Sequence, residues 1–113
     1  MIPIVIEQNY GIIIEILSKN SVRITIQCEY LNVDEPEITE LSYDPHKHLV
    51  YMNDAPNDPF TCESHEMYVK FVITVLETLR AQNNISQKVF FILADNKYIP
   101  YNENTFNERI YAS

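Results

Sequence analysis

Glycine is nearly absent from the sequence, since Gly11 is the only glycine among 113 residues. Loops that cradle phosphates, and the turns that bind dinucleotides, need several glycines so that the backbone can approach the phosphates closely. The nucleophile elbow of serine hydrolases also needs a glycine on each side of its serine. These routes to catalysis are excluded, and no other catalytic or cofactor motif stands out. We therefore expect a protein that is not an enzyme and that carries no cofactor.

Long apolar runs and cysteines are also scarce. No run approaches the ~20 apolar residues that a helix needs to cross a bilayer, and the first residues, Met1 to Ile4, lack the basic region and the cleavage site of a secretory signal. The two cysteines, Cys28 and Cys62, are too few for the disulfide framework of small secreted domains. We expect a cytoplasmic protein that does not contact a membrane.

The apolar residues that are present predict one domain over residues 1–113, because this length suffices for a single hydrophobic core. Strict alternation over 22–30 predicts a half-buried strand, and the same period over 11–18 predicts its hairpin partner. Four further strands are expected, at 4–6, 47–53, 89–94 and 98–101. Two polar, proline-containing segments, 32–44 and 54–59, are interpreted as loops.

One long helix is predicted over about 64–82, with Ser64 as its N-cap. Its apolar residues form a single stripe at helical spacing: Tyr68, Phe71, Val72, Val75, Leu76 and Leu79. A capping-box spacing between Thr105 and Glu108 predicts a short helix in the tail. The expected fold is therefore α+β with two layers, in which the long helix packs on a mainly antiparallel sheet of about five to six strands.

Negative charge is concentrated in the middle of the chain. The segment from Ile24 to Val69 holds ten acidic residues and one base, Lys47, for a net charge of −9. The remaining residues carry six acids and seven bases, so the formal total of −8 comes entirely from the middle. Charge of one sign creates a directional field that steers a partner of the opposite sign. Clustered charge can also serve solubility alone.

From this charge we expect a small binding module of the inhibitor, immunity or anti-defence type, such as phages and mobile elements encode. It would dock on a basic protein surface, for example that of a nucleic-acid-binding enzyme, whose groove would accept carboxylates as a DNA mimic. Direct binding to nucleic acid is disfavoured, because carboxylates would have to approach phosphates. The residues expected to bind the partner are Asp34, Glu35, Glu37, Glu40, Asp44, Asp54 and Asp58, with Tyr43 as an apolar anchor.

Two alternatives remain open. His46, His48, Cys62 and His65 lie within twenty residues of sequence, and four such ligands suit tetrahedral zinc. The alternative role for these residues is that of exposed or capping side chains. A structural subunit of a larger, phage-like assembly is a further possibility, and it would associate through the edges of its sheet.

Overall fold

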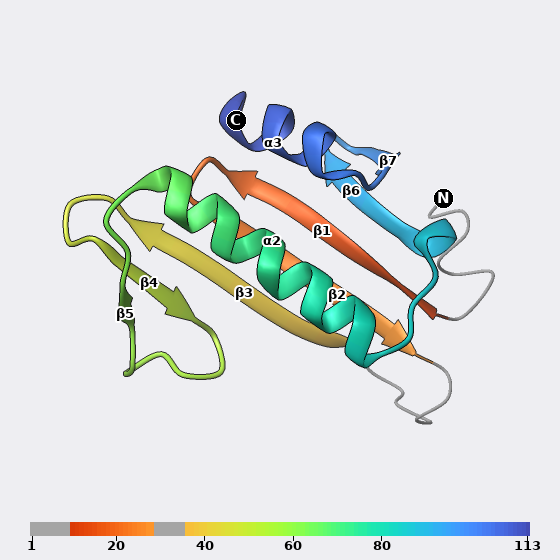
Figure 1. Ribbon diagram of the computed structural model, residues 1–113, viewed down its shortest axis with the longest axis horizontal. Helices are drawn as coiled ribbons and strands as arrows, with labels where there is room; N and C mark the ends of the chain where they lie inside the picture. Colours follow the sequence, from red (N-terminus) through yellow and green to blue (C-terminus); the bar gives the residue numbers. More distant parts are fainter. Residues whose placement is uncertain (1–9, 29–35) are drawn as a thin grey trace.

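The computed structural model describes residues 10–28 and 36–113 (Figure 1). In this part of the chain, seven strands form one sheet in the order β5-β4-β3-β2-β1-β6-β7. The elements in chain order are β1 (Tyr10–Ser18), β2 (Ser21–Cys28), β3 (Glu37–Asp44), β4 (Leu49–Met52), β5 (Phe60–Thr61), α2 (His65–Gln82), the 3-10 turn η2 (Gln87–Val89), β6 (Phe90–Ala94), β7 (Lys97–Pro100) and α3 (Glu103–Tyr111). The expected α+β class is confirmed, but the sheet has seven strands and is larger than predicted; α3 is the helix that was expected in the tail.

The sheet is mixed because the chain returns to it through α2. β6 lies beside β1 and runs parallel to it, with Ile12 opposite Phe90 and Ile14 opposite Ile92. A helical connection of this length permits a parallel pairing that a short turn does not. The other five pairings are antiparallel, so the prediction of a mainly antiparallel sheet holds.

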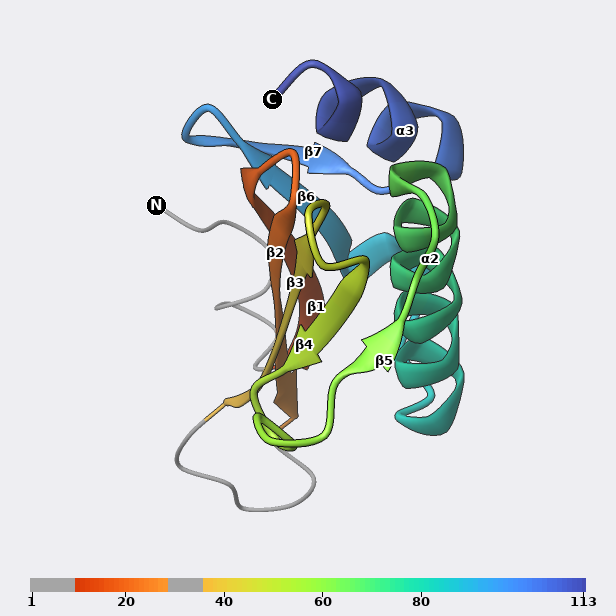
Figure 2. The ribbon, with the colours of Figure 1, turned by 90° about the vertical axis from the view of Figure 1, so that its left-hand side faces the viewer.

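Both helices cover the same face of the sheet (Figure 2). The core between the layers is lined by alternate strand residues and by one side of each helix: Ile12, Ile14, Val22, Ile24, Ile26, Leu41, Val50, Phe90 and Ile92 from the strands, and Tyr68, Val72, Leu76, Phe106 and Ile110 from the helices. We call the opposite side of the sheet the outer face. It carries the other alternate residues, including a small apolar cluster of Ile13, Phe91, Leu93 and Tyr98.

The long helix begins and ends as its sequence predicts. Ser64 caps α2 by accepting a hydrogen bond from the Met67 N–H at 3.2 Å, and Arg80 lies in the last turn, where a cation is favourable. The second helix starts earlier than the predicted capping box, because Asn102 rather than Thr105 is its N-cap. Among the described residues, neither helix is long and apolar enough to cross a membrane.

The prediction of a loop over 32–44 is wrong for its second half, which forms β3. Pro36 directly precedes the strand and so removes no hydrogen bond from it. Leu41 and Tyr43 are buried against the helix layer, but Glu37 and Thr39 take the earlier inward positions and Ile38 points outward, which obscures the alternation in the sequence. The predicted strand at 4–6 lies outside the described residues.

Candidate functional site

The carboxylates of the middle segment fall into two groups along β3. Glu37, Glu40, Asp54 and Asp58 belong to the first half of the strand and to the turn 53–58 beside it, whereas Asp44 ends the strand. An eight-residue strand spans roughly 23 Å between its first and last Cα atoms, at about 3.3 Å per residue. The described carboxylates therefore do not converge on a single patch. Asp34 and Glu35 lie outside the described residues.

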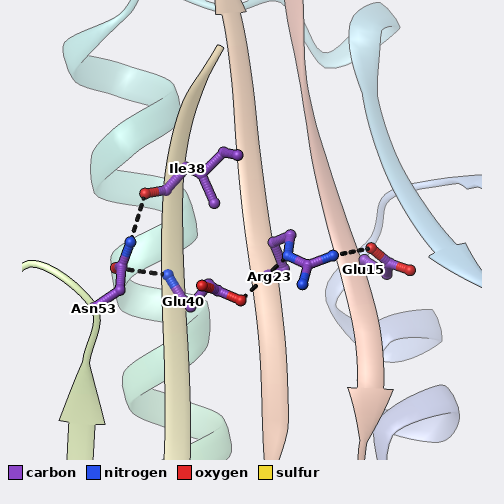
Figure 3. A network of polar contacts seen from close by, with 5 residues as sticks. All are labelled: Glu15, Arg23, Ile38, Glu40 and Asn53. Atoms are coloured by element: carbon purple, nitrogen blue, oxygen red, sulfur yellow. Dashed lines mark hydrogen bonds and ion pairs between the residues drawn. The ribbon is translucent and has the colours of Figure 1, made fainter. Parts of the chain in front are cut away.

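The turn 53–58 is tied to β3 by Asn53 (Figure 3). The Asn53 Oδ1 atom accepts a hydrogen bond from the Glu40 N–H at 2.9 Å, and its Nδ2 donates to the Ile38 carbonyl at 3.0 Å. Within the turn, the Ala55 N–H donates to the Met52 carbonyl, and the Asp58 N–H donates to the Ala55 carbonyl. These bonds hold Asp54 and Asp58 on a short, well-defined turn beside the outer face.

Three of the expected carboxylates are exposed, namely Glu37, Asp54 and Asp58. None of the three forms an ion pair with a residue in 10–28 or 36–113. Strand alternation places Glu37 on the side of the helix layer, opposite to Glu40, so Glu37 borders the sheet edge and not the outer face. Glu37 therefore does not share a face with Glu40.

Glu40 belongs to an ion network that crosses three strands (Figure 3). Glu15, Arg23 and Glu40 stand directly opposite one another on β1, β2 and β3. Arg23 Nε donates to Glu40 Oε2 at 3.2 Å, and Arg23 Nη1 donates to Glu15 Oε1 at 3.3 Å. Arg23 lies outside the acidic segment, so the count of charges along the sequence does not reveal that it pairs with Glu40. The network keeps a net charge of −1.

A hollow of about 290 Å³ lies on the outer face beside this network. Its lining residues come from β2, β3, β4 and the turn after β4: Ser21, Glu40, Leu41, Ser42, Tyr51, Met52, Asn53 and Pro56. Ser21 stands opposite Ser42, and Ser42 stands opposite Tyr51, so three hydroxyl-bearing side chains form a row across the sheet. No sequence motif identified this row, because only the strand register brings its members together.

Tyr43 lies in the core and not on the surface where a partner anchor was expected. It is 6% exposed, its hydroxyl donates to the Cys62 carbonyl at 3.0 Å, and its ring stacks on Tyr68. Burial raises the pKa of Tyr43, with smaller contributions from Cys62 and Asp44. As on many strands, the side chain that faces the helix layer is structural.

Asp44 stabilises the turn that follows β3. Its Oδ1 atom accepts hydrogen bonds from the backbone N–H groups of His46 at 2.9 Å and Lys47 at 3.1 Å. The bond from Lys47 is the main reason that the pKa of Asp44 is lowered from its ordinary value, and the bond from His46 acts in the same direction. This carboxylate is therefore already engaged by its own backbone.

The histidines and cysteine of the zinc alternative serve different local roles. His46 and His48 are exposed in the turn before β4, where His48 adopts a left-handed conformation, so the strand predicted from residue 47 begins only at Leu49. Cys62 is buried and its thiol contacts the Ser64 carbonyl at 3.3 Å, whereas His65 Nε2 is 2.6 Å from the Lys19 carbonyl. Across the described residues, no three His, Cys, Asp or Glu side chains are grouped so as to hold a metal ion.

The arrangement on the outer face is one that can bind cations. A hollow with a carboxylate and three hydroxyls adjoins a turn that carries two exposed aspartates. Such a surface offers hydrogen-bond acceptors and negative charge to a ligand of opposite charge. Comparisons of the chain with protein-family models, curated protein sequences and solved structures find no match.

Proposed function

We propose that this protein is a non-enzymatic binding module whose outer face and turn 53–58 dock on a basic surface of a partner protein. The observation that carries this proposal is the turn itself. Asp54 and Asp58 are exposed and form no ion pair within the described residues, and Asn53 ties their turn to β3 through its side chain. A turn that is already held in one conformation loses little conformational entropy when the protein binds its partner.

The chemistry of this surface favours a protein partner over nucleic acid. Carboxylates repel phosphates, and Arg23, the base that contacts Glu40 at the hollow, is bound by two carboxylates. A basic groove that normally receives phosphates is one surface of the right charge. An inhibitor of a nucleic-acid-binding enzyme is therefore the partner relationship that we favour, with the carboxylates acting in place of phosphates.

The proposal is tested by reversing charge at two matched sets of positions. In the first variant, Asp54→Lys and Asp58→Lys change the proposed surface. In the control, Glu103→Lys and Glu108→Lys make the same change in total charge at exposed positions elsewhere. The wild-type protein and both variants are immobilised, exposed to a lysate at low and high salt, and the retained proteins are identified.

We expect the wild-type protein and the control to retain the same basic protein at low salt and to release it at high salt, because salt screens exposed charges. The first variant should not retain that protein, although its circular dichroism should be unchanged. Retention that survives high salt, or that is lost equally in both variants, would contradict the proposal. In the second case the total charge, and not this surface, would govern binding.

A further inference from the structure

We infer that the hollow beside Glu40 is a specificity pocket for one arginine side chain of the basic partner. This inference rests on the proposed function and adds to it the chemical group that is recognised. The pocket is concave, whereas the turn 53–58 presents its charge on an exposed loop. A volume of about 290 Å³ is at the lower limit of small-molecule sites, which suits a single side chain better than a cofactor.

The lining of the hollow includes hydrogen-bond acceptors that have no partner among the described residues. Only the Oε2 atom of Glu40 is engaged by Arg23, and among the described residues the Oε1 atom has no hydrogen-bond partner. The hydroxyls of Ser21, Ser42 and Tyr51 likewise form no hydrogen bond within the described part of the chain. A carboxylate oxygen and three hydroxyls can all accept hydrogen bonds from a cationic group, and the negative charge of Glu40 disfavours an anionic one.

The arrangement of these acceptors fits a guanidinium group better than an ammonium group. They come from neighbouring strands, which lie about 4.8 Å apart, so they are spread across the floor of the hollow and not gathered at one point. A guanidinium is planar and presents five N–H donors in a fork, whereas an ammonium is a compact point charge. The arginine donors can therefore reach Glu40 and a hydroxyl together.

The apolar part of the lining suits the stem of the same side chain. Pro56 and the half-buried Tyr51 belong to the lining of the hollow, whereas the Met52 side chain packs against the core on the other side of the sheet. Long basic side chains bury their methylene stems on such surfaces, and a guanidinium also stacks on an aromatic ring. Both parts of an arginine side chain thus find a matching surface in one hollow.

The ion network beside the hollow keeps Glu40 available to a second cation. Arg23 shows that the Glu40 carboxylate can bind a guanidinium from its own chain (Figure 3). Because Glu15 also binds Arg23, the positive charge of Arg23 is shared between two carboxylates. An arriving arginine therefore meets a site with one net negative charge, and not a neutral ion pair.

Two pairs of matched variants separate the pocket from the general charge of the surface. Glu40→Gln and Glu15→Gln each remove one carboxylate partner of Arg23, but only Glu40 lines the hollow. Ser42→Leu fills the hollow, and Thr61→Leu introduces the same side chain at an exposed strand position outside it. Each variant is titrated with a short oligoarginine peptide, with an oligolysine peptide of equal length and with a citrulline peptide as the uncharged analogue.

For the wild-type protein we expect oligoarginine to bind more tightly than oligolysine, and the citrulline peptide to bind most weakly. Glu40→Gln and Ser42→Leu should each weaken oligoarginine binding roughly tenfold, which corresponds to the loss of a charge-assisted hydrogen bond. Glu15→Gln and Thr61→Leu should change it less than about threefold. Backbone amide chemical shifts should move at Ser42 and Tyr51 during the titration.

The results distinguish a failure of this inference from a failure of the proposed function. If reversal of Asp54 and Asp58 abolishes oligoarginine binding while Glu40→Gln and Ser42→Leu leave it intact, the hollow is not the pocket but the acidic surface still binds. Equal affinity for oligolysine would also overturn the inference. If the wild-type protein binds neither peptide in a salt-dependent way, the proposed function fails as well.

Discussion

Asn53 and Glu40 form two hydrogen bonds with each other, although β4 has already ended at Met52. The Asn53 side chain accepts from the Glu40 N–H at 2.9 Å, and the Asn53 N–H donates to the Glu40 carbonyl at 3.2 Å. A side-chain amide thus continues the hydrogen bonding of a strand past its last residue. This satisfies backbone groups of β3 that would otherwise lie at an unpaired edge.

The variant Asn53→Ala should lower the free energy of unfolding by about 1–2 kcal/mol, because two side-chain hydrogen bonds to the backbone of β3 are lost. Urea denaturation measures the loss. Hydrogen exchange of the Glu40 amide should become faster at the same time. Asn53→Asp is the comparison variant: it keeps an acceptor for the Glu40 N–H, so it should keep that amide protected, but it sets a carboxylate oxygen against the Ile38 carbonyl and should still lose stability. An unchanged exchange rate at Glu40 in Asn53→Ala would contradict the role assigned to Asn53.

Two buried tyrosines should respond in opposite ways to removal of their hydroxyls. Tyr68 donates to the Leu41 carbonyl at 2.7 Å, so Tyr68→Phe should destabilise the protein by about 1 kcal/mol. The Tyr101 hydroxyl is buried with no partner in the described part of the chain, so Tyr101→Phe should leave stability unchanged or raise it by about 1 kcal/mol. Denaturant titration of both variants tests the difference, and an equal loss in both would show that Tyr101 has an unseen partner.

The ionisation of Tyr101 supplies a second readout of its environment. Burial, followed by the carboxylates of Glu77 and Glu103, raises the pKa of Tyr101 to about 12. A raised pKa contributes stability below the ordinary value of 10.0, and that contribution is lost as the pH rises towards 12. The stability of the wild-type protein relative to Tyr101→Phe should therefore fall over this interval. A difference that does not depend on pH between 10 and 12 would contradict the burial of this hydroxyl.

Asp44 should make the turn before β4 sensitive to acid. Its pKa is lowered in the folded protein from an ordinary value of 3.8, so its contribution to stability is complete above that value and is lost as the pH falls through the folded pKa. Asp44→Ala should lower the Tm at neutral pH, and the difference from the wild-type protein should shrink in acid. Asp44→Asn is the control, because its amide oxygen can accept the same backbone hydrogen bonds without titrating. A difference that stays constant into strong acid would contradict this role.

Arg23 should contribute little to stability but should influence binding. Its ion pairs are partly exposed, so Arg23→Met should cost less than about 1 kcal/mol, and salt should reduce the cost further. The same variant frees the Oε2 atom of Glu40 and makes the outer face more negative. We therefore expect it to bind oligoarginine at least as tightly as the wild-type protein. Weaker binding would show that Arg23 positions Glu40 for the ligand.

Several elements could be predicted from the sequence because local patterns determine them. The long helix follows from an apolar stripe at helical spacing and from Ser64, whose side chain accepts the first free N–H group. The first hairpin follows from alternation on both sides of a polar turn. By contrast, β3 was missed because its apolar residues, Leu41 and Tyr43, are few and lie among acids after Pro36. Its pairing with β2 and β4, and not its own composition, makes it a strand.

The sequence by itself determined the α+β class, the long helix and the acidic middle segment, since periodicity and net charge are properties of neighbouring residues. Only the tertiary structure decided which carboxylates remain available. It paired Glu40 with Arg23 across two strands and bound Asp44 to its own turn. It also aligned Ser21, Ser42 and Tyr51 beside Glu40. The physical reason is that strand register joins residues far apart in the chain, and no local pattern specifies which residues become opposite neighbours.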